Sequence, residues 1–340
     1  MRLERILDAI SPNTLPYGMF TRELSDREAR RAKRLESIYH VGQDRIWDGR
    51  EILSELIAKH GTNNLDERTK QALGRIFSII MWGELAAWRI SAQLADVLEP
   101  LEAKLAASSQ VHDEARHFYV MHDYLEAIGA PPKPMDPASR RVVELTLATH
   151  DLPKKILGMQ ITIETMALTI FAQVRALEVD PVLTELLAYY ERDEARHVGL
   201  GVQLLPQLLG KMSIPERLSL LAFQTNLMLS AMLSLRAMEP DLATLGVRAR
   251  DVMMLGFRKN LEVHEMIRAD NPDTPEKPPI EYFMNVANEM LFPEEGPHSS
   301  VPVGERARRA FDAARGARPG LREGSLEARR GGQAKLRVAA

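Results

Sequence analysis

The sequence predicts an all-α protein, a four-helix bundle with additional helices at its N- and C-terminal ends. Apolar residues recur at intervals of three and four along most of the 340 residues, and no alternating strand-like run reaches a useful length. The pentapeptide Asp-Glu-Ala-Arg-His occurs twice, at residues 113–117 and 193–197. A lone glutamate in apolar sequence lies 30 residues before the glutamate of each copy.

The first helical stretch, 22–58, is charged and amphipathic, and we expect it to break near residues 40–43. The remaining helices are expected at 65–98, 101–128, 138–149, 154–178, 181–209, 213–237, 241–270 and 280–291. Prolines set most of these boundaries, because proline ends or bends a helix. The connections at 130–134 and 271–279 are both rich in proline.

The chain divides into three predicted segments. Helices within residues 1–64 are expected to pack on the bundle, and residues 65–292 form the bundle with its extra helices. Residues 293–340 are predicted to be a disordered basic tail. Within it, residues 304–340 hold ten basic and four acidic residues with few large apolar side chains.

The bundle contains an internal repeat of a helical hairpin. A shift of 80 residues takes positions 84, 114 and 117 to positions 164, 194 and 197, where the same residue types stand. Pro100 and Pro181 lie near the middle of the two 30-residue intervals. A hairpin that turns at each proline brings the two ends of its interval to the same height.

These repeated residues predict a site for two metal ions. Glutamate and histidine three residues apart lie on one face of a helix, so each pentapeptide directs a carboxylate and an imidazole to one point. Two such helices, each paired with a helix that carries one more inward glutamate, form a four-helix dimetal site. The expected ligands are Glu84, Glu114, His117, Glu164, Glu194 and His197.

The charges of this ligand set favour the same interpretation. Four glutamates balance two divalent ions, whereas four carboxylates facing one apolar cavity without metal would have to take up protons. A single Asp-Glu-x-Arg-His segment is more often a solvated face with an ion pair. Two copies, each with its lone glutamate, favour the metal site. The sequence has no cysteine, and oxygen and imidazole ligands suit iron or manganese.

The remaining charged residues of the pentapeptides are expected behind the ligands. Asp113 is placed to accept the free ring N–H of His197 across the bundle, and Asp193 that of His117. A carboxylate behind a ligating histidine fixes its tautomer and raises its basicity. Arg116 and Arg196 would then balance the two aspartates.

Composition limits the partners of the protein. A net charge of −3 and a pI of about 6.3 give no reason to expect nucleic acid or membrane binding. The N-terminal ten residues lack the apolar core of a signal peptide, so we expect a cytoplasmic protein. Residues 218–235 carry no charge but include six polar side chains. They predict a buried or subunit-interface helix rather than a membrane span, and a homodimer.

At these residues the chain resembles the ferritin-like di-iron carboxylate superfamily. Its Asp-Glu-x-Arg-His segments resemble those of the large subunits of bacterial multicomponent monooxygenases. Residues 193–201 also resemble the R2-like proteins, both ribonucleotide reductase small subunits and R2-like ligand-binding oxidases. The resemblance covers roughly residues 70–235. It implies a ferritin-like bundle with two iron ions, or a Mn/Fe pair, and O2 as co-substrate.

The sequence departs from the signature of each subfamily. The radical tyrosine of the reductases is replaced by Met121. The cross-linked tyrosine of the ligand-binding oxidases is replaced by Met159, and its valine partner by Ala86. The threonine of the monooxygenases corresponds to Leu168, and the additional histidine of the arylamine N-oxygenases to Tyr190.

The leading functional prediction is an O2-activating di-iron oxidase or oxygenase that acts on a small, largely apolar organic substrate. Glu164, in the third-ligand position, is the carboxylate expected to shift during catalysis. The predicted substrate pocket, whose members also suit plain core packing, consists of Leu85, Trp88, Met121, Leu168, Phe171 and Tyr190. Electrons would come from a separate ferredoxin or flavoprotein reductase, because the chain carries no nucleotide motif of its own.

Two alternatives belong to other functional classes. One is iron storage with ferroxidase activity, as in ferritins, although the helices before residue 65 and after residue 210 argue against assembly into a cage. The other is an R2-like metal- and ligand-binding protein with little turnover.

Overall fold

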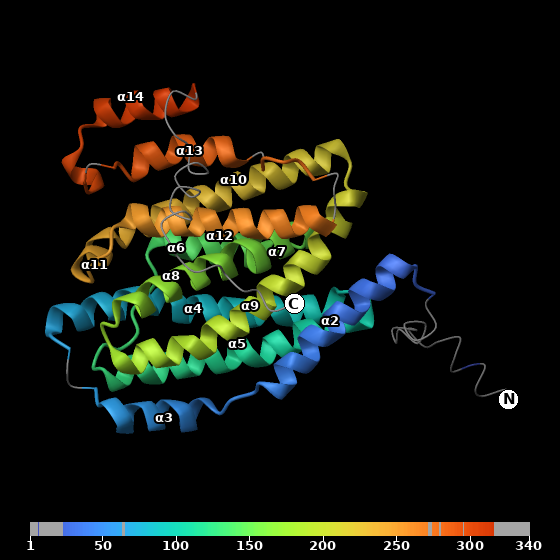
Figure 1. Ribbon diagram of the computed structural model, residues 1–340, viewed down its shortest axis with the longest axis horizontal. Helices are drawn as coiled ribbons and strands as arrows, with labels where there is room; N and C mark the ends of the chain where they lie inside the picture. The colour runs from blue at the N-terminus through green and yellow to red at the C-terminus, as the bar shows by residue number, and fades with distance from the viewer. Residues whose placement is uncertain are drawn as a thin grey trace.

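The computed structural model describes residue 6 and residues 23–62, 65–270, 274–278, 280–294 and 296–315. Every regular element in these ranges is a helix (Figure 1). The prediction of an all-α fold is therefore confirmed.

Two helical hairpins form the bundle. The first joins α4 (Glu67–Val97) to α5 (Leu101–Ala127). The second joins a composite helix to α9 (Pro181–Lys211), and the composite helix consists of α7 (Leu152–Ile156), the π-helical segment η2 (Leu157–Ile163) and α8 (Glu164–Leu177). Helix α4 packs along α5, α8 packs along α9, and α5 contacts α9 across the bundle.

Local sequence explains where the hairpins turn. Pro100 is the N-cap residue of α5. Asp180 caps α9 by accepting a hydrogen bond from the Leu183 backbone N–H, and Pro181 occupies the first turn, where its missing N–H costs nothing. The two prolines therefore lie at the turns, as the spacing predicts.

The N-terminal helices α2 (Asp26–Asp44) and α3 (Gly49–His60) pack against α5 and α9. The break between them falls at residues 45–48 and not at 40–43. The Asp48 side chain accepts hydrogen bonds from the backbone N–H groups of Arg50 and Glu51, so this cap fixes where α3 begins.

A second group of helices covers the other side of the bundle (Figure 1). It comprises α6 (Pro137–Ala148), α10 (Ile214–Ala237), α11 (Glu239–Thr244), α12 (Ala249–Asp270), α13 (Ile280–Leu291), the 3-10 helix η3 (His298–Ser300) and α14 (Val303–Ala314). The helix predicted at 241–270 is split into α11 and α12, because Gly246 between them has a φ angle of 82°.

The structure differs from the predicted disordered tail at residues 303–314, which form α14. This helix packs on α13, and the Arg306 guanidinium donates a hydrogen bond to the Met290 carbonyl at 3.0 Å. Its arginines had suggested a solvated tail, but their stems and hydrogen bonds hold the helix in place. Residues 316–340 of the predicted tail lie outside the described residues.

Two described helical stretches are long and apolar enough to cross a membrane by length and composition alone, Leu152–Leu177 and Ile214–Ala237. The most apolar window of the first is 78% buried, as expected for the core helix of a bundle, whereas that of the second is 44% buried. This is weak evidence for a span in either case.

Candidate metal centre

The six predicted ligands converge at the centre of the bundle. Glu84 comes from α4, Glu114 and His117 from α5, and the other three from α8 and α9. All six side chains are buried. Their ligand atoms form two groups, one of Glu84, Glu114, His117 and Glu194 and the other of Glu114, Glu164, Glu194 and His197. Within each group these atoms lie within 4.8 Å of one another.

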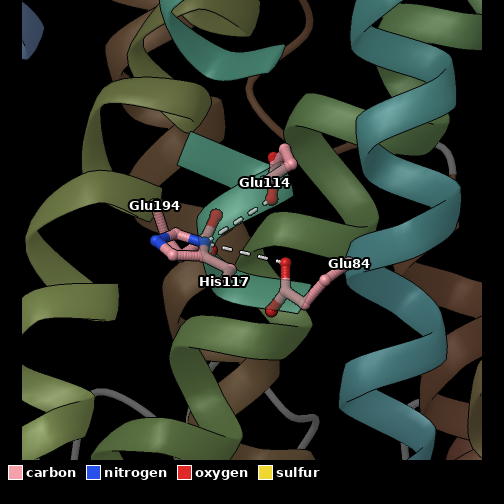
Figure 2. A group of neighbouring side chains, drawn as sticks. All are labelled: Glu84, Glu114, His117 and Glu194. Carbon is pink, nitrogen blue, oxygen red and sulfur yellow. Dashed lines mark ion pairs between the residues drawn. The ribbon is translucent and has the colours of Figure 1, made fainter. Parts of the chain in front are cut away.

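Figure 2 shows the first group, in which three carboxylates from three helices point toward one imidazole. His117 Nδ1 lies 3.1 Å from Glu194 Oε1, 3.6 Å from Glu114 Oε2 and 3.7 Å from Glu84 Oε2. The ring therefore presents Nδ1 to the carboxylates.

The second group repeats this arrangement. His197 Nδ1 lies 2.8 Å from Glu194 Oε2, 3.2 Å from Glu114 Oε1 and 3.6 Å from Glu164 Oε1. Glu114 and Glu194 each give one oxygen to each histidine, so these two carboxylates are shared by both groups. Glu84 and Glu164 each belong to one group only.

Behind the histidines lies an Asp–Arg network of Asp113, Arg116, Asp193 and Arg196, all of them buried. His117 Nε2 is 3.3 Å from Asp193 Oδ2, and His197 Nε2 is 3.4 Å from Asp113 Oδ2. This is the cross-bundle pairing expected from the sequence.

Each arginine of the network contacts both aspartates. Arg116 donates to its neighbour Asp113 and, at 3.0 Å, to Asp193. Arg196 donates to Asp193 at 2.9 Å and to Asp113 at 2.8 Å. Two buried positive charges therefore balance two buried negative charges, which is what burial of ions requires.

The surroundings divide the four glutamates into two classes. Burial raises the pKa of Glu84 and of Glu164 well above the ordinary value, and the charge of Glu194 raises both further. Burial also opposes ionisation of Glu114 and Glu194, but the nearby histidines outweigh it and hold both pKa values below the ordinary value. The shared carboxylates are therefore the more acidic pair.

The histidines take up the complementary charge. Burial disfavours the imidazolium form of His117, but the carboxylates of Asp193, Glu114 and Glu194 around the ring outweigh it and raise its pKa well above the ordinary value. Burial is outweighed in the same way at His197, mainly by the charges of Glu114 and Glu194. Without metal, the surroundings thus favour the protonated forms of the two imidazoles and of Glu84 and Glu164.

A cluster of this kind suits divalent ions, as its unpaired atoms indicate. Glu114 Oε2, His117 Nδ1 and Glu194 Oε1 are buried and make no hydrogen bond, although buried polar atoms almost always find a partner. All three belong to the same group of converging atoms. Oxygen and imidazole donors in this number fit iron or manganese, so the residues present fit the predicted pair of ions.

Glu164 is supported by elements that the sequence did not predict. It directly follows η2, a π-helical stretch of seven residues in which Thr162 Oγ1 donates to the Leu157 carbonyl at 3.0 Å. Single π-helical turns are rare and occur frequently at functional sites. Gly201 on α9 permits this geometry, because a Cβ there would lie 2.5 Å from Gln160 Cβ.

Two buried glutamines extend the site on this side. Gln110 Nε2 donates to Glu164 Oε1 at 2.7 Å and to Glu114 Oε1 at 2.8 Å. Gln160 Nε2 in turn donates to Gln110 Oε1 at 3.0 Å. Both glutamines precede a ligand glutamate by four residues, and that spacing could have identified them.

Trp47 is another residue that sequence reasoning missed. It lies in the connection between α2 and α3, and its Nε1 donates to Asp193 Oδ2 at 2.8 Å. The Arg116 guanidinium lies over its ring, 4.7 Å from the centroid. The only local signal is a tryptophan in a charged segment directly before the Asp48 cap.

The six residues predicted to form the substrate pocket do not lie together in the structure. Trp88 is 38% exposed and Leu85 is half-buried, whereas Ala86 and Ala87 on the same turn of α4 are buried. The other four are buried in two separate core clusters, with Met121, Phe171 and Tyr190 in one and Leu168 in the other. A different set of described residues lines the cavity beside Glu84 and Glu164.

Tyr190 nevertheless adjoins the metal centre. Its ring stacks on His117, with ring centroids 4.2 Å apart and an interplanar angle of 19°. Its hydroxyl donates to the His117 backbone carbonyl at 2.7 Å. Tyr190 therefore holds the helix and ring of one ligand, as a packed core tyrosine with a satisfied hydroxyl.

The fold and the cluster define a ferritin-like helical bundle with a buried carboxylate–histidine centre. Among solved structures, the chain is similar to a point mutant of an R2-like ligand-binding oxidase with an aerobically reconstituted Mn/Fe cofactor. The TM-score is 0.52 and the sequence identity 15%, over 72% of this chain and 94% of that chain. At this identity the likeness shows the fold. No protein-family model matches the chain, and no curated protein matches it either.

Proposed function

We propose that this protein is a dimetal oxidase or oxygenase that activates O2 and acts on a small, largely apolar organic substrate. The observation that carries the proposal is the convergence of four buried glutamates and two buried histidines into two overlapping groups. The fold shared with an oxidase that carries a Mn/Fe cofactor supports it. The metals are proposed as Fe/Fe, with Mn/Fe as the other pair.

The geometry supports a proposed role for each ligand. Glu114 and Glu194 would bind both ions, because each offers one oxygen to either group. Glu84 and Glu164 would each bind one ion. When bound, the ions would supply redox equivalents and Lewis acidity for O2 chemistry.

The Asp–Arg network sets the protonation of the histidine ligands. A carboxylate can only accept, so His117 holds a proton on Nε2 toward Asp193, and His197 holds one on Nε2 toward Asp113. Each Nδ1 lone pair is then directed at the carboxylates, where an ion would lie. The proton that Nδ1 carries in the metal-free protein must leave when metal binds.

Glu164 is the carboxylate that we propose to move during turnover. It stands where η2 meets α8, and a π-helical turn can relax toward α-helix with a small shift of the following residue. Gln110 can follow such a shift, because its amide already contacts both Glu164 and Glu114.

The remaining expectations stay part of the proposal. A separate ferredoxin or flavoprotein reductase would supply electrons, and the protein would act as a cytoplasmic homodimer. An R2-like metal- and ligand-binding protein with little turnover is the second candidate, favoured by the similarity of the fold to that of a ligand-binding oxidase. Product formation after O2 exposure would separate the two.

The test is metal stoichiometry with oxygen reactivity. Anaerobic loading should give two Fe(II) per chain, and brief exposure to air should produce near-ultraviolet absorption from oxygen-to-iron charge transfer. One tightly bound zinc ion per chain without oxygen reactivity would refute the proposal.

A further inference from the structure

An apolar cavity adjoins the two outer ligands of the metal centre. Its lining comes from α4, α6, the composite helix and α10, and includes both Glu84 and Glu164. The cavity volume is about 60 Å³. Helix α6 lies over the gap between α4 and the composite helix, because it contacts α4, η2 and α10. The Asp–Arg network lies behind the histidines and does not line this cavity.

We propose that this cavity is the substrate-binding site of the proposed oxidase, that its ligand is uncharged and apolar, and that the ligand enters past Gly83. That this ligand is a substrate rests on the proposed function. The chemistry of the ligand and its route rest on the cavity alone.

The lining determines the charge of the ligand. Its described residues include Ile80, Val142, Met159 and Ile163, and none of them is a lysine, arginine or histidine. An anionic ligand would therefore be buried without a counter-charge, beside two carboxylates, which is costly. A cationic ligand would compete with the metals for the same carboxylates. Only an uncharged molecule avoids both costs.

The hydroxyl groups of the lining do not call for a polar ligand. Ser139 and Ser234 are buried, and their Oγ atoms lie 2.6 Å apart. Ser139 Oγ also donates to Asp136, the N-cap residue of α6. These contacts satisfy the two hydroxyls within the protein, so they tie α6 to α10 and leave the cavity wall apolar.

Gly83 marks the entrance. It lines the cavity from α4 and is half-buried, like Ile79, Met135 and Val143, which also line it. A Cβ added at Gly83 would meet no heavy atom within 4 Å. A side chain at this position would therefore occupy open space at the cavity and would not clash with the backbone. Glycine in the interior of a helix is otherwise unfavourable.

A second apolar cavity of about 50 Å³ lies beyond the first. The two share three lining residues, Met166, Ile170 and Met238. Each is smaller than the ~150 Å³ cavity that admits benzene in an engineered protein. Methionine side chains are flexible and adapt to irregular space, so movement of Met166 and Met238 can join the two cavities around a ligand.

The test uses 1-hexanol as an uncharged probe, with hexanoate and hexylammonium as charged probes of the same chain length. Binding is measured by calorimetric titration into protein loaded anaerobically with Fe(II), so that no turnover occurs. Hexanol should bind more tightly than either charged probe. Gly83→Leu should weaken hexanol binding by about tenfold or more, and Gly83→Ala by less, with iron content unchanged.

Gly210→Leu is the matched control. Gly210 is also a helical glycine with open space at its Cβ, but it lies in the last turn of α9 and does not line either cavity. Hexanol binding should be unchanged in this variant. Equal weakening in both leucine variants, or hexanoate binding as tight as hexanol binding, would overturn the proposal. Gly83→Ala keeps the test decisive should the leucine variant fail to fold.

Iron content separates this inference from the proposed function. Wild-type protein that takes up no iron would refute the proposed function, whatever the probes do. Wild-type protein that binds two iron ions, with hexanol affinity indifferent to Gly83→Leu, would refute the cavity proposal alone.

Discussion

The two halves of the centre carry the same ligands but support the outer glutamate differently. Glu84 lies within the regular helix α4, whereas Glu164 stands at the junction of η2 and α8. Gln110 holds Glu164 with a hydrogen bond of 2.7 Å, and Gln160 holds Gln110. The same ligand set is thus built on one regular helix and on one helix with a local irregularity.

The positions four residues before the shared glutamates differ as well. Gln110 precedes Glu114, and Tyr190 precedes Glu194. The glutamine contacts carboxylates of the site, whereas the tyrosine supports the backbone and ring of His117. The first hairpin therefore supplies an amide that contacts the carboxylates, and the second supplies a ring that stacks on His117 and a hydroxyl that donates to its backbone. The internal repeat accounts for the matching ligands, and the different residues around them account for the asymmetry.

The largest expected loss of metal binding follows from removal of a shared ligand. The two halves of the centre should respond equally to this change. Glu114→Ala and Glu194→Ala should each abolish binding of two Fe(II) ions, because each removes one oxygen from both groups. Glu84→Ala and Glu164→Ala should reduce binding nearly as much. The loss of binding is measured as iron per chain after anaerobic loading. If the Glu114→Ala variant still bound two iron ions, the shared-ligand geometry would be contradicted.

A smaller effect is expected from the carboxylates behind the histidines. Asp113→Asn and Asp193→Asn should leave the fold intact and weaken metal affinity by about 10–100-fold. Asp193 also accepts a hydrogen bond from Trp47, so Trp47→Phe should reproduce only a fraction of the Asp193→Asn effect. Competition with a chelator measures the affinities. Wild-type affinity in both asparagine variants would show that the cross-bundle pairs do not support the ligands.

The pH dependence should separate the metal-free protein from the loaded one. His117 and His197 have raised pKa values when folded, so their contribution to stability is full below the unfolded value of about 6.5 and is lost as pH rises through the folded value. Glu84 and Glu164, also raised, act in the same direction. The metal-free protein should therefore lose stability as pH rises above neutrality.

The loaded protein should show the opposite trend, because ions displace those protons and bind more tightly at higher pH. The gap in Tm between Mn(II)-loaded and chelator-treated protein should widen from about pH 6 to about pH 8. A gap that narrows would contradict the assignment of protons to the ligand histidines. Below about pH 4, the lowered pKa values of Glu114 and Asp193 should destabilise the metal-free protein as well.

The smallest expected effect is on stability, and it tests whether Tyr190, unlike Gln110, has only a supporting role. Tyr190→Phe should cost about 0.5–1.5 kcal/mol of unfolding free energy, the value of one hydrogen bond, with metal binding retained. No long-lived tyrosyl radical should appear by electron paramagnetic resonance after the diferrous protein meets O2. A persistent radical that disappears in Tyr190→Phe would make radical generation the leading function.

The sequence predicts which glutamates and histidines converge, because this convergence depends on local spacing along the helices. A helical period fixes which residues share a face, and the prolines fix where each hairpin turns, so Glu84 and Glu114 meet as expected. The same rules fail for Trp88, which is exposed although it lies one turn beyond Glu84. Periodicity identifies a face of a helix, but only packing decides which neighbour covers it.

The sequence also does not predict contacts between segments that are far apart in the chain. Trp47 reaches Asp193 from a loop 146 residues away, and no spacing rule applies to such a pair. The cavity beside Glu164 depends on how α6 crosses the bundle. Helix α14 was missed because its arginines suggested solvent, although Arg306 and Arg309 are buried. Long charged side chains can cover a helix as well as apolar ones.

The Asp–Arg network also constrains how the two copies can change. Each arginine contacts the aspartate of its own copy and that of the other, and each histidine finds its acceptor in the opposite copy. A substitution that removes one of these four charges therefore leaves the network unbalanced in both copies, so neither copy can lose a charge without affecting the other. The surroundings of Glu84 and Glu164 are under no such mutual constraint. Interlocked charges of this kind give a physical reason for two identical pentapeptides inside hairpins whose other residues differ.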